Sequence, residues 1–108
     1  MKLSSLPFKE IVSGKKVIES RLYDEKRRQI NPGDRIDFIC NNDLSKSVPT
    51  TVIALYHYSN FENLFSDFSP SFFGRNSKEE LVEEIRSFYS KEEQEEYGVI
   101  GIKIKIIS

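Results

Sequence analysis

The sequence has little of what a disulfide, a metal centre or a histidine mechanism requires. Cys40 is its only cysteine and His57 its only histidine. One cysteine excludes an intrachain disulfide and a cysteine metal site, and it suits a reducing compartment. One histidine excludes a histidine metal cluster and a two-histidine mechanism, so we expect His57 to be a structural or surface residue. Since Asp24, Asp34 and Asp37 are spread over predicted turns, we expect no metal site.

Long apolar runs are also absent. No run is long enough to cross a bilayer, and residues 1–5 are too short and too polar for a signal peptide. Hydrophobic residues make up 38% of the 108 residues and charged residues 31%, which is typical of a globular chain. We therefore expect a single cytoplasmic domain spanning residues 1–108, without membrane association and without a cofactor.

The charges that are present are unevenly distributed. The formal net charge is only -1, but residues 1–35 carry nine Lys or Arg against five Asp or Glu. Residues 78–96 carry three basic residues against eight acidic ones. One part of the surface is therefore expected to be basic, and a basic face can bind a phosphate backbone locally.

Hydrophobic periodicity predicts alternating short strands and helices. Alternation predicts strands over 16–23, 35–40, 49–58 and 98–107, with a short strand within 1–4. Helical spacing predicts helices over 6–13 and 78–89, a helical turn over 60–65 and a short acidic helix after Ser90, with 41–47 as a polar loop. This pattern indicates a small α+β domain closing into a barrel or half-barrel. The expected core residues are Ile18, Phe38, Leu81, Ile85, Ile102 and Ile104.

The stretch at residues 13–21 has the strongest polar pattern. In a strand, Ile18 and Leu22 face a core while Glu19 and Arg21 share the opposite face. Lys16 lies on the Ile18 side of an ideal strand, and it joins Glu19 only if the strand begins at or after Lys16 or bends there. The stretch is either a small polar site of fixed geometry or a solvated strand face with a surface ion pair worth about 0–1 kcal/mol.

Gly14, Lys16, Glu19 and Arg21 resemble the G-x-K-x-x-E-x-R signature of ASCH domains, the activating signal cointegrator homology group. The resemblance extends through nearly the whole chain in the same order. Its further elements are Gly33-Asp34, Tyr58 to Phe61, Phe88-Tyr89-Ser90 and Tyr97-Gly98-Val99. It implies a PUA-like β-barrel of about five strands with peripheral helices, similar to the small stand-alone prokaryotic members. It also implies a ligand cleft beside the signature strand, for RNA or a modified nucleoside.

Members of this family differ in function: some resemble RNA-binding modules, one branch is acetylcytidine amidohydrolase, and a metal-dependent ribonuclease is known. Fold alone does not choose among them. The amidohydrolase branch uses a Lys, a Thr and a Glu. Its Lys matches Lys16, but its Thr position falls on Glu19. Its Glu position, before the long helix, falls where Phe72, Phe73 and Gly74 stand here.

Three functions follow from these residues. The first is a binding module for single-stranded RNA or a modified nucleoside, in which Lys15, Lys16 and Arg21 contact phosphate or a base edge. Glu19 then holds Arg21 or accepts a hydrogen bond from a nucleobase amine. The second is a small hydrolase with Lys16 as base or nucleophile and Glu19 as general acid/base. Tyr89 is expected to orient the ligand. The third is a protein-interaction domain that uses the acidic helices.

Overall fold

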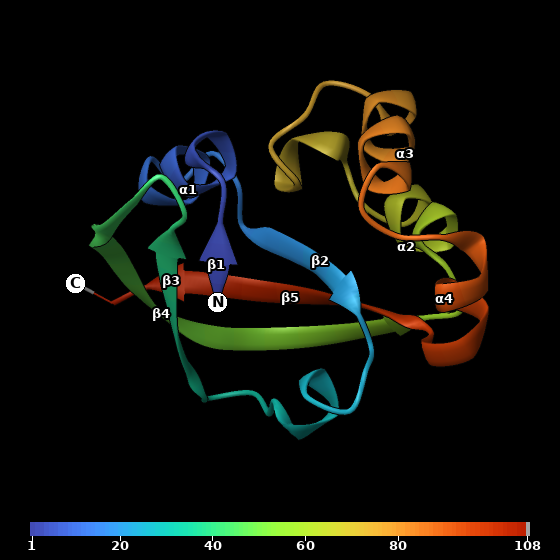
Figure 1. Ribbon diagram of the computed structural model, residues 1–108, viewed down its shortest axis with the longest axis horizontal. Coiled ribbons are helices and arrows are strands. Elements are labelled where there is room, and N and C mark those ends of the chain that lie inside the picture. The colour runs from blue at the N-terminus through green and yellow to red at the C-terminus, as the bar shows by residue number, and fades with distance from the viewer. Residues whose placement is uncertain (108) are drawn as a thin grey trace.

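A computed structural model describes residues 1–107, and a five-stranded sheet lies at its centre (Figure 1). The strands are β1 (Lys2–Leu3), β2 (Ile18–Leu22), β3 (Arg35–Cys40), β4 (Asp43–Tyr58) and β5 (Val99–Ile106). The helices are α1 (Ser5–Val12), α2 (Phe61–Ser66), α3 (Lys78–Arg86) and α4 (Lys91–Tyr97), with short 3₁₀ turns η1 (Arg27–Gln29) and η2 (Pro70–Phe72).

The sheet curls so that its two edge strands approach each other. The strand order is β1-β3-β4-β5-β2; β1 runs parallel to β3 and every other pairing is antiparallel. At the seam between the edges, Arg21 Nη2 on β2 donates a hydrogen bond to the backbone oxygen of Lys2 on β1, at 3.0 Å. The fold is therefore an α+β half-barrel with peripheral helices, as the sequence predicts.

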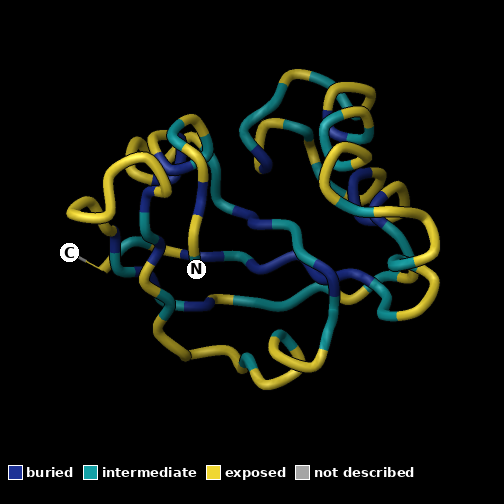
Figure 2. Tube along the Cα trace, viewed as in Figure 1, coloured by how far each residue is buried: buried dark blue, intermediate teal, exposed yellow. Residues whose placement is uncertain are grey.

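Two hydrophobic clusters pack against opposite faces of this sheet. One fills the concave side and includes Phe38, Ile102 and Ile104. The other lies between the outer face and helices α2 and α3, and it includes Ile18 and Leu81. Strand β5 contributes to both clusters and β2 contributes Ile18 and Leu22 to the second, and buried residues follow these two strands in Figure 2. The charged side chains of Glu19 and Arg21 on β2 also have little access to water.

Local capping signals position the helices on the acidic side of the molecule. The Ser77 hydroxyl accepts from the backbone N–H of Glu80 at 3.2 Å and begins α3. Ser90 and Glu93 form a complete capping box that begins α4. Gly98, at φ 72°, ends α4 in a conformation that L side chains rarely adopt. Both starts agree with the helices predicted over 78–89 and after Ser90.

Four sequence-based predictions are wrong in detail. Residues 43–47 belong to β4 instead of a loop, because their backbone pairs with β3 as an exposed hairpin arm that needs no apolar alternation. Strand β2 covers only 18–22, not 16–23, and α3 ends at Arg86 instead of residue 89. Ile85, expected in the core, is only partly buried because it lines an open cleft.

Among residues 1–107, no helix is long and apolar enough to cross a membrane.

Candidate functional site

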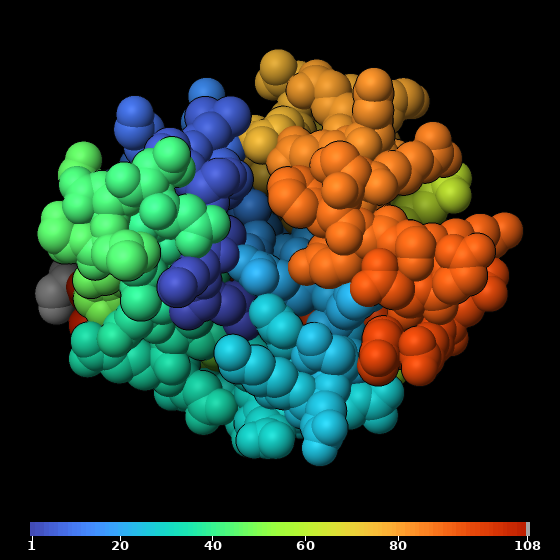
Figure 3. Space-filling view, viewed as in Figure 1, coloured from blue at the N-terminus to red at the C-terminus, as the bar shows by residue number. Residues whose placement is uncertain are grey.

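A cleft opens at the free edge of β2, between the N-terminal segment and α3. Its volume is about 230 Å³, and Figure 3 shows it as the hollow between the blue N-terminal residues and the orange α3 region. Strand β2 forms the floor, β1 and α1 form one wall, and α3 with the residues after it forms the other. The side chains that line the cleft include Lys2, Pro7, Lys16, Glu19, Arg21, Leu81, Glu84, Ile85, Phe88 and Tyr89.

Glu19 lies at the centre of the floor, with only 4% of its surface exposed. Its Oε1 is 2.8 Å from Lys16 Nζ, and its Oε2 is 2.8 Å from Arg21 Nη2. Arg21 Nε donates a second bond to Oε2 at 3.0 Å. Burial by itself would raise the pKa of Glu19, but the two cations outweigh burial and lower this pKa below its ordinary value. The carboxylate therefore stays ionised and holds both cations in place.

Lys16 reaches Glu19 because it precedes the regular strand. Its backbone forms an isolated bridge with Phe73, and its N–H donates to the Glu10 oxygen at 3.0 Å. Regular pairing with β5 begins only at Ile18. The strict alternation that would point Lys16 to the other face does not apply, so three charges from a six-residue stretch converge on one point.

Arg21 connects the cleft to the seam of the half-barrel. Besides Glu19, it binds the Lys2 backbone oxygen, and Tyr89 lies close enough to affect its ionisation. Burial would lower the pKa of Arg21, but Glu19 and, to a lesser degree, Tyr89 raise it above its ordinary value. Arg21 is thus a permanent cation fixed from three sides.

The predicted binding residues are not all in the cleft. Lys16, Glu19, Arg21 and Tyr89 line it, whereas Lys15 is exposed and is not among the lining residues. The interpretation of Glu19 and Arg21 as a solvated surface pair is wrong, because their side chains are only 5% and 16% exposed. Both side chains lie on the floor of a cleft instead of on an open strand face.

A second ion cluster in the cleft wall was not expected from the sequence. Arg75 Nη1 donates to Glu10 Oε1 at 2.7 Å, while its Nε and Nη2 donate to Glu84 at 2.7 and 3.0 Å. This cluster links α1 to α3 and places the Glu84 side chain in the cleft. Gly74 allows it, because a Cβ there would come within 2.7 Å of the Glu10 carboxylate. Gly74, directly before Arg75, is the only nearby sequence feature that could have pointed to this cluster.

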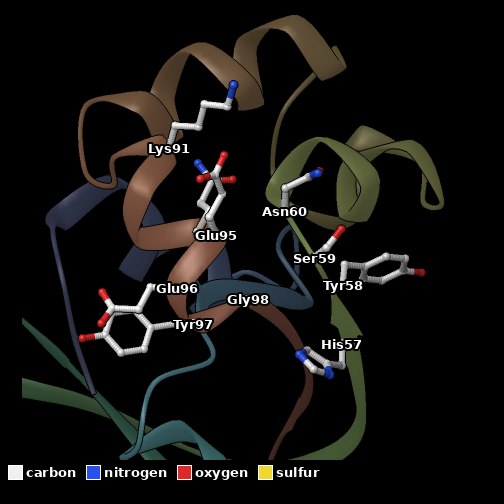
Figure 4. A pocket seen from close by; sticks show the side chains of 10 residues that line it. His57, Tyr58, Ser59, Asn60, Lys91, Glu95, Glu96, Tyr97 and Gly98 are labelled. Carbon is white, nitrogen blue, oxygen red and sulfur yellow. The ribbon is translucent and has the colours of Figure 1, made fainter.

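A wider depression of about 700 Å³ lies between α4 and the end of β4. Figure 4 shows Lys91 and Glu95 on the helix side and Ser59 and Asn60 on the other. His57 at its edge packs on Tyr23, with ring centroids 4.3 Å apart.

No group of three His, Cys, Asp or Glu side chains within residues 1–107 is arranged to hold a metal ion.

Comparison with known proteins relates this chain to solved structures over its full length. Hypothetical protein PH0355 is 37% identical, covers 99% of this chain and 100% of its own, and superposes with a TM-score of 0.82. Protein PF0455 from Pyrococcus furiosus is 32% identical over 100% of this chain and 99% of its own, with a TM-score of 0.72. An ASCH protein from Zymomonas mobilis, at 18% identity, shares the fold alone, with a TM-score of 0.51 over 96% of this chain and 65% of its own.

No curated protein matches the sequence. The family description "ASCH domain", in contrast, matches residues 1–108. The full-length match agrees with the half-barrel fold and with the signature residues on and before β2. The chain therefore belongs to the ASCH domain family.

Proposed function

We propose that this protein binds RNA or a modified nucleoside in the cleft at the free edge of β2. The observation that carries the proposal is the arrangement of Lys16 and Arg21 around the buried Glu19. A single carboxylate fixes two cations and leaves an excess positive charge at the floor. Such a floor is suited to a phosphate or to a base edge that carries carbonyl oxygens.

Further positive charge lies beside the cleft on the N-terminal side. Lys2 lines the cleft itself. A bound nucleotide could therefore direct its phosphate toward this side and its base toward α3.

The size of the cleft favours a small ligand. Pockets for drug-sized molecules usually measure about 300–1,000 Å³. The volume of about 230 Å³ found here suits one nucleoside unit instead of a folded RNA surface. The ligand is then either a free nucleoside or one unpaired nucleotide of a longer chain.

Hydrolysis of a nucleoside or RNA is the alternative function, since Lys16 and Glu19 contact each other at 2.8 Å within the cleft. A lysine nucleophile must be a neutral amine, however, and an ammonium paired with a carboxylate is a binding group. We therefore favour binding. Incubation with acetylcytidine tests the alternative: cytidine release by the wild type that is lost in Lys16→Ala would favour the hydrolase.

The binding proposal is tested by titrating short single-stranded RNAs and ribonucleosides at several salt concentrations. For RNA, the logarithm of affinity should fall with the logarithm of salt concentration by about 0.7 for each phosphate neutralised. Arg21→Ala should weaken binding, whereas Arg21→Lys should retain part of it. Lys91→Ala on α4 is the matched control and should leave affinity unchanged. Equal affinity for the wild type and a folded Arg21→Ala would rule out this cleft.

A further inference from the structure

Phe88 is an exposed aromatic residue at the mouth of the cleft, and its backbone is fixed. Phe88 is 65% exposed and lines the cleft. Its N–H donates to the Ile85 oxygen at 3.0 Å, and the Ser87 hydroxyl donates to the Glu84 oxygen at 2.6 Å. The Ser90 capping box begins two residues later. The ring is therefore held in water by an ordered turn instead of by a loose chain end.

The neighbouring Tyr89 has a different environment. Its ring packs nearly parallel on Phe61, with centroids 5.5 Å apart and an interplanar angle of 19°, and it lies near Arg21. One face of this ring is already covered by the protein. Phe88 is the aromatic side chain of this wall that is left for a ligand.

The surroundings of Phe88 select the chemistry of that ligand. Pro7 lines the same cleft from α1, on the opposite wall, and the Lys16 and Arg21 cations lie at its floor. A planar ring placed between Phe88 and Pro7 would have apolar contacts along its faces and hydrogen-bond donors along one edge. An unpaired nucleobase with carbonyl oxygens fits this description, and a base paired inside a duplex cannot enter.

We propose that Phe88 is the stacking residue of this cleft and that it makes the cleft selective for an unpaired nucleobase. This inference rests on the proposed binding function and names its ligand more closely. Stacking tolerates any base, whereas the cations at the floor favour bases that present acceptor oxygens. The base belongs either to a free nucleoside or to a single-stranded RNA, and these sources share the same chemistry.

A fluorescence experiment tests the stacking directly, because the chain contains no tryptophan. Phe88→Trp introduces one fluorophore at the cleft mouth, and Phe72→Trp introduces one at a matched control position. Phe72 is also exposed, at 42%, but it does not line the cleft. Titration with uridine, cytidine or single-stranded RNA pentamers should quench Phe88→Trp and not Phe72→Trp, and a short RNA duplex is titrated as the control. The duplex should have no effect.

Affinity measured by calorimetry is the second readout. Phe88→Ala should weaken binding by about fivefold to a hundredfold, the range expected for loss of one stacked base, while Phe72→Ala should change nothing. Quenching by both nucleosides and RNA, or by RNA alone, supports the inference and identifies the source of the base. Wild-type binding that Phe88→Ala leaves intact, without quenching of Phe88→Trp, overturns the stacking role but not the proposed function. Absence of wild-type binding to every probe overturns both.

Discussion

Two ion clusters at the same cleft are charge inverses of each other. In the Glu19 cluster, one carboxylate lies between two cations, Lys16 and Arg21. In the Arg75 cluster, one guanidinium lies between the two carboxylates of Glu10 and Glu84. Their formal charges are therefore +1 and -1.

The comparison shows that similar contacts can have different roles. The Glu19 cluster lies on β2 and on the residues just before it, and it presents its excess charge to the cleft floor. The Arg75 cluster joins α1 to α3, the helices on the two sides of that floor. We infer that the first cluster recognises the ligand and the second maintains the space in which the ligand fits.

Removing the central charge of the Glu19 cluster should have the largest effect. Glu19→Gln leaves Lys16 and Arg21 close together without their carboxylate, and we expect a loss of about 3–5 kcal/mol in the free energy of unfolding. Urea unfolding measures this loss. A variant as stable as the wild type would show that the buried carboxylate is not needed to offset the two cations.

Removing the central charge of the Arg75 cluster should cost somewhat less. Arg75→Leu leaves the buried Glu10 carboxylate unpaired, but the Glu84 side chain is 40% exposed and can turn to water. We expect a loss of about 3 kcal/mol, together with faster amide exchange in α3. If α3 exchanges at the wild-type rate, the cluster does not hold the cleft wall.

The pH dependence of the free energy of unfolding should reveal the lowered pKa of Glu19. Because its folded-state pKa is lowered from the ordinary value of 4.5, its contribution is present above about pH 4.5 and is lost as the pH falls through the folded value. The contribution is about 1.4 kcal/mol for each unit of lowering. The stability gap between wild type and Glu19→Gln should narrow on acidification. A gap that stays constant down to pH 2 would contradict the lowered pKa.

An exposed ion pair provides the smallest expected effect and a control for both clusters. Arg35 and Asp37 lie 2.9 Å apart on β3, with side chains 64% and 51% exposed. Asp37→Asn should change the free energy of unfolding by about 0–1 kcal/mol, because water screens this pair. A change as large as that of Glu19→Gln would show that burial is not what distinguishes the two pairs.

The sequence could predict the Glu19 cluster because its members are close together in the chain. Strand alternation alone places Glu19 and Arg21 on one face, and this prediction is confirmed. The position of Lys16 depends on where β2 begins, which is set in part by a backbone bridge to the distant Phe73. Alternation within the strand cannot indicate such a bridge.

The Arg75 cluster could not be predicted, since Glu10 and Arg75 are separated by 65 positions.

The position of Phe88 near the end of a helix could be predicted in part. Helical spacing placed it on the buried side of a helix over 78–89, yet Ser90 begins a second helix and requires non-helical residues before it. The Ser90 and Glu93 capping box therefore indicates that the first helix ends before Ser90, which leaves Phe88 in or next to its last turn.

The pairing of β2 with β5 also has a consequence for the order of folding. The floor strand β2 pairs with β5, which is the last strand of the chain, and the opposite wall comes from α3. Contacts between such distant segments form slowly, because a long loop must close before they gain any stability. The floor of the cleft therefore cannot be complete until residues 99–106 have paired with β2. The cleft is thus among the last features of the sheet to form.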